Sequence, residues 1–124
     1  MNTPMRILVA EDDDSMRRAI GRLLKAAGLQ SVEFDSAEAL LQSGQLDAAD
    51  CVVTDIHLGG MSGFQLVETL RRDHRRMPAV FMTAFDSPAS RTEALNCGMS
   101  AYLVKPFEGT ALLEAIRRVT AFRA

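Results

Sequence analysis

Short apolar runs alternate with longer amphipathic stretches five times along this chain of 124 residues. Four of the runs are residues 7–10, 51–54, 79–82 and 101–104, and the fifth is seeded by Val32 and Phe34. This alternation is typical of βα units, in which each strand of a parallel sheet is followed by a helix. The sequence therefore predicts an α/β fold with five strands and five helices.

Each of the four strongly apolar runs is followed by a polar side chain. In an open parallel sheet, ligands bind in the crevice outside the carboxyl ends of the strands, so we expect these side chains to meet at one edge. They comprise three carboxylates, a hydroxyl and an ammonium: Glu11, Asp12, Asp55, Thr83 and Lys105. Such a set is suited to hold Mg²⁺ and to accept a phosphoryl group.

Glu11 and Asp12 open an acidic run that continues through Asp13 and Asp14. Acidic residues at the start of a helix commonly interact with its dipole, and we assign that role to Asp13 and Asp14, with Asp14 or Ser15 as the N-cap. Glu11 and Asp12 are assigned to a metal. Carboxylates 4 Å apart repel by roughly 4 kcal/mol at an effective dielectric of 20, and Mg²⁺ between them would remove that cost.

Asp55, Thr83 and Lys105 each allow a structural interpretation beside the chemical one. An aspartate after a strand can cap the following loop, threonine favours strands, and a lysine at a strand end can be solvated. In the chemical interpretation, the Asp55 carboxylate is a nucleophile that forms an acyl phosphate. Thr83 then donates a hydrogen bond to one phosphoryl oxygen, and Lys105 pairs with another.

Composition argues against several classes of function. The 48% hydrophobic and 24% charged residues are ordinary for a globular domain, and the formal net charge of −2 gives no general attraction to nucleic acid or anionic membranes. No apolar run approaches the roughly 18–20 residues that span a bilayer, and the first residues lack the apolar core of a signal peptide. We expect one cytoplasmic domain over residues 1–124, with no direct nucleic-acid or membrane partner.

Local signals predict several helix boundaries. Gly28 is expected to follow a helix over residues 14–27. Residues 62–65, with the sequence Ser-Gly-Phe-Gln, fit a capping box at the start of another helix. A later helix has two candidate starts, either Ser87 followed by proline or a capping box at Ser90.

A basic cluster lies near the end of the helix that follows the first of these capping boxes. It contains Arg71, Arg72, Arg75 and Arg76. We interpret the cluster as cations that favour the helix dipole and solubility, with a docking patch as the alternative.

At these residues the chain resembles a response-regulator receiver domain, the CheY-like phosphoacceptor domain of bacterial two-component signalling. The resemblance covers residues 4–122. It rests on Ile7-Leu8-Val9-Ala10-Glu11-Asp12-Asp13, Val53-Thr54-Asp55-Ile56-His57-Leu58, Met61-Ser62-Gly63, Met82-Thr83-Ala84 and Val104-Lys105-Pro106-Phe107. Each motif is weak alone, but together they are highly specific, because they occur in the family's order and at its separations.

The resemblance implies a single doubly wound, flavodoxin-like (βα)5 domain with a parallel five-stranded sheet of order 2-1-3-4-5. Helices 1 and 5 would cover one face, and helices 2, 3 and 4 the other. It also implies that Asp55 receives its phosphoryl group from a histidine kinase or a histidine phosphotransfer protein, and that the chain is not a turnover enzyme. Residues 105–108 most resemble the FixJ-type branch, whose members often carry a DNA-binding domain after the receiver.

The resemblance assigns further roles to matching positions. Glu11, Asp12, Asp55 and the backbone carbonyl of His57 would hold Mg²⁺. Thr83 and Tyr102 match the family's switch pair. On phosphorylation this pair would alter the face made by helix 4, strand 5 and helix 5, which would control an output domain or partner and can mediate a homodimer.

Three neighbours of the acceptor are expected to set the lifetime of the phosphoryl group: His57, Ala84 and Phe85. The bulk of Phe85 should slow hydrolysis, whereas the small Ala84 leaves room for the phosphoryl group. Pro106 makes the peptide bond that precedes it a candidate for the cis isomer.

The chain departs from the family pattern at two places of interest. Glu11 replaces the commoner aspartate, and Gly59-Gly60 replaces the usual proline-containing turn. A hydrolase of the haloacid-dehalogenase type is disfavoured, because His57 stands where that family has an acid and a cap domain has no counterpart here. A phosphate-independent binding module is disfavoured too, since such modules usually lack an acid, the acceptor or the lysine.

Overall fold

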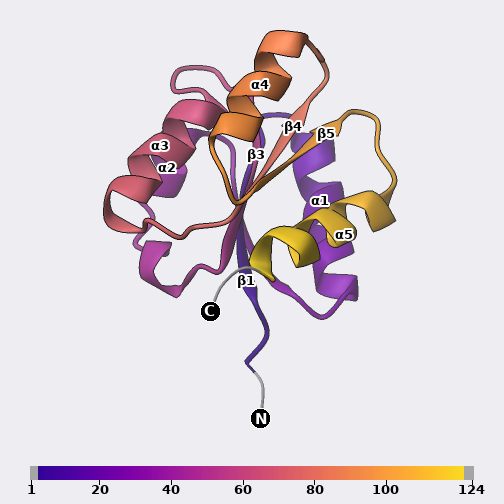
Figure 1. Cartoon of the computed structure of the whole chain (residues 1–124). Helices are drawn as coiled ribbons and strands as arrows, with labels where there is room; N and C mark the ends of the chain where they lie inside the picture. The colour runs from indigo at the N-terminus through magenta and orange to yellow at the C-terminus, as the bar shows by residue number, and fades with distance from the viewer. Residues whose placement is uncertain (1–2, 122–124) are drawn as a thin grey trace.

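The computed structural model describes residues 3–121, in which strands and helices alternate (Figure 1). The strands are β1 (Arg6–Ala10), β2 (Gln30–Phe34), β3 (Cys51–Asp55), β4 (Ala79–Thr83) and β5 (Ser100–Val104). The α-helices are α1 (Asp14–Ala26), α2 (Ala37–Leu41), α3 (Gly63–Asp73), α4 (Pro88–Asn96) and α5 (Gly109–Thr120), with a 3₁₀ turn, η1 (Leu46–Ala48), before β3. The predicted alternation of five strands and five α-helices is confirmed.

The five strands form one parallel sheet in the order β2-β1-β3-β4-β5. Ile7 pairs with Cys51, and Val53 pairs with Val80, so β3 lies in the centre of the sheet. The chain moves from β1 outward to β2 and then back across β1 to β3. This reversal is the topological switch point at which open α/β sheets hold their ligands.

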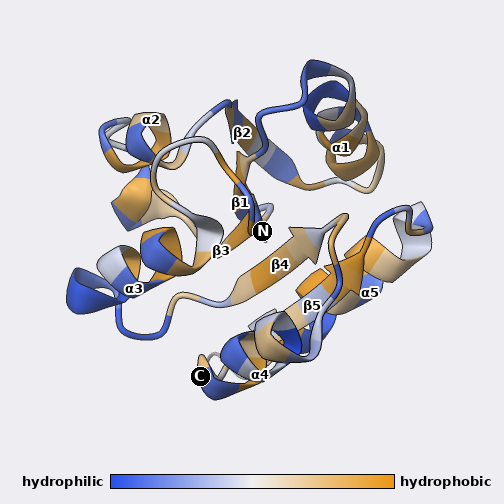
Figure 2. Cartoon of the chain, turned by 90° about the horizontal axis from the view of Figure 1, so that it is seen from above, coloured by the Kyte–Doolittle hydropathy of each residue, from blue (hydrophilic) through white to orange (hydrophobic). Residues whose placement is uncertain are grey.

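Helices cover both faces of the sheet (Figure 2). Leu24 of α1 and Ile116 of α5 belong to one buried cluster, while Leu40 of α2, Leu66 of α3 and Ala94 of α4 belong to the other. The predicted division, with helices 1 and 5 on one face and helices 2, 3 and 4 on the other, is therefore confirmed.

The strands feed both clusters because successive side chains point to opposite faces. Ile7 and Val9 of β1 enter the cluster beneath α1 and α5, whereas Leu8 and Ala10 enter the other. Residues of β3 and β4 are buried throughout. This explains why these runs are continuously apolar, as is typical of parallel sheets covered on both faces.

Most helix ends follow the predicted local signals. Ser62 and Gln65 form both hydrogen bonds of the capping box at α3, and Gly28 has φ +82° after the end of α1. Ser87 caps α4, with its hydroxyl accepting from the Ser90 amide at 3.1 Å and proline in the first turn. Of the two candidate starts, the first is therefore the one adopted.

The predicted N-cap of α1 is wrong by one residue. Asp13, rather than Asp14 or Ser15, has the extended backbone of a cap, and its carboxylate accepts from the Met16 amide at 3.2 Å. Asp13, Asp14 and Ser15 all have side chains that can cap a helix. The backbone turn after β1 decides between them.

The interpretation of the basic cluster accounts for only part of the role of Arg71, which does lie in the last turn of α3. Its half-buried guanidinium donates to the Met77 carbonyl and, across to the end of α4, to the carbonyls of Cys97, Gly98 and Met99. Burial lowers the pKa of Arg71. In these contacts the guanidinium donates to neutral carbonyl oxygens and not to a carboxylate. Arg71 is therefore a structural tie between α3 and the loop that precedes β5.

None of the helices among residues 3–121 combines the length and the apolar character that crossing a membrane requires.

Candidate functional site

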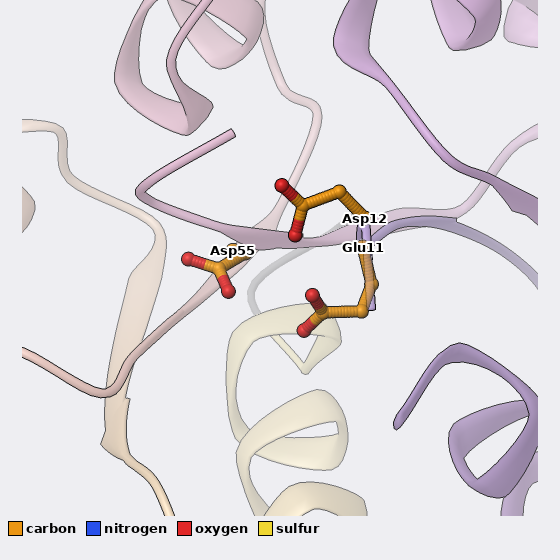
Figure 3. A group of neighbouring side chains, drawn as sticks. All are labelled: Glu11, Asp12 and Asp55. Atoms are coloured by element: carbon orange, nitrogen blue, oxygen red, sulfur yellow. The ribbon is translucent and has the colours of Figure 1, made fainter. Parts of the chain in front are cut away.

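Three carboxylates meet at the carboxyl ends of β1 and β3. Glu11 and Asp12 follow β1, Asp55 ends β3, and one oxygen from each lies within 4.8 Å of the others. Figure 3 shows the three side chains converging from the two strands. Glu11 is fully buried and Asp55 is 7% exposed, whereas Asp12 is open to solvent. We call this edge of the sheet, at the carboxyl ends of the strands, the rim. It concentrates negative charge, part of which is buried.

Lys105 neutralises part of this charge. It follows β5, and its Nζ lies 2.5 Å from Glu11 Oε1 and 2.5 Å from Asp55 Oδ2. The peptide bond between Lys105 and Pro106 is cis, which confirms that prediction. The convergence of Glu11, Asp12, Asp55 and Lys105 on one edge of the sheet is as the sequence predicts.

The pKa values of this cluster respond to burial and pairing. Burial raises the pKa of Glu11, against hydrogen bonds from Lys105 and the Asp13 amide that lower it. Burial also acts to lower the pKa of Lys105, but hydrogen bonds to Asp55 and Glu11 outweigh it, so the pKa is raised. The ammonium is consequently held in its charged form between the two carboxylates.

The backbone around Asp55 is tightly constrained. Its Oδ1 accepts from the His57 amide at 2.8 Å, which orients the carboxylate along the rim. The Gly63 amide donates to the Ile56 carbonyl at 3.0 Å. A Cβ on Gly63 would lie 2.3 Å from the Asp55 carbonyl oxygen, so only glycine fits where α3 begins. The sequence indicated Gly63 only as part of a capping box and a family motif.

Thr83 lies at the end of β4 and is fully buried. Its hydroxyl oxygen accepts from the Phe85 amide at 2.9 Å, so the side chain is engaged with the segment that leads into α4. Because a hydroxyl also has a hydrogen of its own, Thr83 retains the capacity to donate.

Tyr102, in the middle of β5, is half-buried and reaches the same segment. Its hydroxyl donates to Asp86 Oδ1 at 2.9 Å, and the Arg91 guanidinium carbon lies 5.1 Å from the centre of its ring. Arg91 in turn donates twice to Asp86. Sequence reasoning identified Tyr102 but missed both of its partners.

The neighbours predicted to affect water access also lie together. The rings of His57 and Phe85 make a T-shaped contact with centres 5.5 Å apart. Phe85 is 69% exposed, and Ala84 beside it is exposed as well. This aromatic contact therefore joins the segment after β3 to the segment after β4.

Arg17 is a further residue of the rim that the sequence did not indicate. Its guanidinium donates to the Glu11 carbonyl at 2.9 Å and pairs with Asp14. It thereby fastens the first turn of α1 to the end of β1. The pairing with Asp14 could have been anticipated from their i,i+3 spacing, but the bond to Glu11 depends on how the chain turns.

Comparison with known proteins identifies the family. The sequence matches the response regulator receiver domain over residues 7–117. It is 37% identical over 113 residues to the response regulator protein FleR of Pseudomonas aeruginosa. The aligned region covers 91% of this chain and 24% of FleR. It is 32% identical to the transcriptional regulatory protein FixJ of Azorhizobium caulinodans, covering 94% of this chain and 56% of FixJ.

A solved structure gives the same result. The chemotaxis protein CheY4 of Vibrio cholerae superposes with a TM-score of 0.86 at 26% identity, over 94% of this chain and 99% of that one. The chain belongs to the response regulator receiver domain family, whose members serve as signalling domains of two-component systems. It spans about a quarter of FleR and about half of FixJ.

The residues at the rim fit the metal that this family binds through acidic side chains. Mg²⁺ prefers oxygen ligands and keeps several waters, and it commonly takes one or two carboxylates together with phosphate oxygens. Glu11, Asp12 and Asp55 supply such oxygens within one small space. Glu11 is already committed on both sides, to Lys105 and to the Asp13 amide at 3.1 Å. The more open Asp12 is the freer of the two acids after β1.

Proposed function

We propose that the chain is a phosphoacceptor that takes a phosphoryl group on Asp55 from the phosphohistidine of a histidine kinase or a histidine phosphotransfer protein. The observation that supports this most is the meeting of three carboxylates and one ammonium at the switch point of the sheet. In the transfer, a bond forms between an Asp55 carboxylate oxygen and phosphorus. The bond between phosphorus and the donor imidazole breaks, and the imidazole keeps its electron pair.

The metal would be held by Glu11, Asp12, Asp55 and the backbone carbonyl of His57. When bound, Mg²⁺ would neutralise the charge of the phosphoryl oxygens as they approach the carboxylates. The Asp55 carboxylate is held for attack by the His57 amide, which fixes one oxygen. Lys105 already lies 2.5 Å from the other oxygen and can follow the charge onto the phosphoryl group.

Thr83 and Tyr102 are proposed as the switch pair. The phosphoryl group adds about −1.5 to −2 charges, and the Thr83 hydroxyl would turn to donate to one of its oxygens. This changes the support of the segment after β4 and, through it, of α4 and Tyr102. The face made by α4, β5 and α5 would then control an output domain or a partner, including a second copy of the chain.

His57, Ala84 and Phe85 are proposed to set how fast the acyl phosphate is lost. The contact between the His57 and Phe85 rings supports this, because His57 also donates its amide hydrogen to Asp55, so the Phe85 ring packs on a residue bound to the acceptor. We also propose that residues 1–124 form one receiver domain that performs no turnover catalysis. Its output would then reside elsewhere, since the chain spans only part of FleR and FixJ.

Intact-mass measurement tests the proposal directly. The chain would be incubated with Mg²⁺ and acetyl phosphate or phosphoramidate, which are small phosphoryl donors. We expect a gain of one phosphoryl group that is lost with EDTA and in Asp55→Asn, and kept in Asp73→Asn, a change of an exposed aspartate at the end of α3. A gain that survives Asp55→Asn would place the acceptor elsewhere. No gain from small donors or from phosphohistidine would leave only a phosphate-independent binding role.

A further inference from the structure

Apolar packing anchors α4 only weakly. Among its nine described residues, Ala94 alone is buried, whereas α1, α3 and α5 each bury several side chains. The helix lies beside β5 near the edge of the sheet (Figure 2). An element with few buried apolar contacts depends on polar contacts for its position. In α4 these contacts are concentrated at the two ends.

The C-terminal end of α4 is held by buried or half-buried groups. The Arg71 guanidinium donates to the carbonyls of Cys97, Gly98 and Met99, at 2.9 Å for Gly98. The Ser100 hydroxyl donates to the Ala94 carbonyl at 2.6 Å. A cation at a helix C-terminus also interacts favourably with the dipole. We call this set of contacts the Arg71 clasp.

The N-terminal end of α4 is held by two exposed charged residues and the half-buried Tyr102. Asp86, just before the helix, accepts from Arg91 Nε at 2.9 Å and Nη2 at 2.8 Å, and from the Tyr102 hydroxyl at 2.9 Å. Arg91 also stacks over the Tyr102 ring. We call these three residues the Asp86 latch. Two parallel hydrogen bonds strengthen the Arg91–Asp86 pair, but its side chains are 59% and 36% exposed, so water screens it. We therefore expect the latch to open before the half-buried clasp does.

The latch is connected to the acceptor rim by a short segment. Thr83 ends β4, and its hydroxyl oxygen accepts from the Phe85 amide, one residue before Asp86. If the Thr83 hydroxyl turns toward a phosphoryl group on Asp55, the Phe85 amide loses this acceptor. The segment then has to rearrange, and the latch is the contact that holds its far end.

We propose that Asp86 and Arg91 are positioning residues that keep the resting arrangement, and that opening the latch lets α4 pivot about the Arg71 clasp. The proposal rests on the proposed function, because it names what opposes the switch from Asp55. It implies that weakening the latch favours the phosphorylated arrangement, since a ligand shifts an equilibrium more easily when the competing state is less stable.

Hydrogen exchange on the unphosphorylated chain tests the latch apart from phosphorylation. The variants Tyr102→Phe, Asp86→Ala and Arg91→Lys would be made in an Asp55→Asn background. Tyr102→Phe removes only the hydroxyl, and Arg91→Lys keeps the charge but loses the paired hydrogen bonds. We expect exchange over residues 84–91 to rise about two- to tenfold and exchange over residues 94–99 to stay unchanged. Arg72→Gln, in a loose surface ion pair with Glu68, is the control.

Phosphoryl uptake provides the second arm, with Asp55 intact. The latch variants should reach half-maximal phosphorylation at an acetyl phosphate concentration about two- to tenfold lower than the unaltered chain. Unchanged exchange over residues 84–91 would overturn the latch, and faster exchange over 94–99 would overturn the pivot. Equal uptake by variants and unaltered chain would overturn the link to Asp55. If the unaltered chain takes up nothing, the proposed function fails, while the exchange arm still decides whether the latch exists.

Discussion

Replacing Lys105 by methionine tests whether its ammonium stabilises the neighbouring carboxylates of Glu11 and Asp55. Methionine keeps much of the length of the side chain and removes its charge. The Lys105 side chain is 17% exposed, and those of Glu11 and Asp55 are 1% and 10% exposed, so water screens the group poorly. Without the ammonium, the carboxylates of Glu11 and Asp55, whose nearest oxygens lie within 4.8 Å of each other, repel by at least about 3.5 kcal/mol at an effective dielectric of 20.

Protonation of Glu11 would relieve part of this repulsion, because burial already raises its pKa. We therefore expect Lys105→Met to lower the free energy of unfolding by about 2–4 kcal/mol in EDTA. For a chain of this length, that corresponds to a fall in Tm of about 8–15 °C. Mg²⁺ would supply the missing positive charge, and binding to the folded state alone stabilises it. Saturating Mg²⁺ should thus raise the Tm of the variant by more than that of the unaltered chain.

The assay is thermal unfolding at neutral pH with EDTA and with saturating Mg²⁺, followed by circular dichroism. Lys25→Met, which changes an exposed lysine in the last turn of α1, is the matched control and should behave like the unaltered chain in both buffers. An equal Mg²⁺ shift in Lys105→Met and in the unaltered chain would refute the reasoning. It would mean that the ammonium and the metal do not compete for the same carboxylates.

Three further substitutions probe other parts of the structure. Gly63→Ala would place a Cβ 2.3 Å from the Asp55 carbonyl oxygen and should lower the free energy of unfolding by about 1–3 kcal/mol; an unchanged urea midpoint would contradict this. Arg71→Met would leave several carbonyls near the end of α4 without their donor. It should lower the free energy of unfolding by about 1–3 kcal/mol in the same urea titration, whereas the control Arg75→Met, at an exposed site, should leave it nearly unchanged. Phe85→Ala should shorten the lifetime of the phosphoryl group proposed on Asp55, because removing the ring gives water more access to it. Intact mass followed over time after removal of the phosphoryl donor measures this lifetime, and an unaltered decay rate would rule out the proposed role of Phe85.

The α/β class and the acidic cluster could be predicted because both follow from position along the chain, whereas the strand order was expected from the family resemblance. Parallel strands end at a common edge, so residues that directly follow the apolar runs are brought together whatever the details of packing. Glu11, Asp12 and Asp55 are adjacent for this reason. Lys105 was predicted at the same edge, but not its bridge between Glu11 and Asp55. That bridge depends on how a long side chain settles among groups 94 and 50 residues away in sequence.

Several contacts of arginine could not be predicted either. Arg17, Arg71 and Arg91 occur on helices, where a cation is ordinarily a solvated group. Each instead bonds to a particular partner: Arg17 to the Glu11 carbonyl, Arg71 to carbonyls near the end of α4, and Arg91 to Asp86. Two of these partners are backbone oxygens, which are present at every position and leave no signal in the sequence.

Charge at the rim explains why the signal would leave by way of Thr83. Glu11, Asp12 and Asp55 carry three negative charges against the single positive charge of Lys105, and that ammonium already has two carboxylate partners at 2.5 Å. On the proposed function, a phosphoryl group adds further negative charge, which the single positive charge of Lys105 does not balance. Thr83 has a hydrogen to donate, and its oxygen holds the Phe85 amide. On this proposal, its turn would both stabilise the new charge and release the segment that the Asp86 latch holds, so one rotation would couple the chemistry at Asp55 to the position of α4.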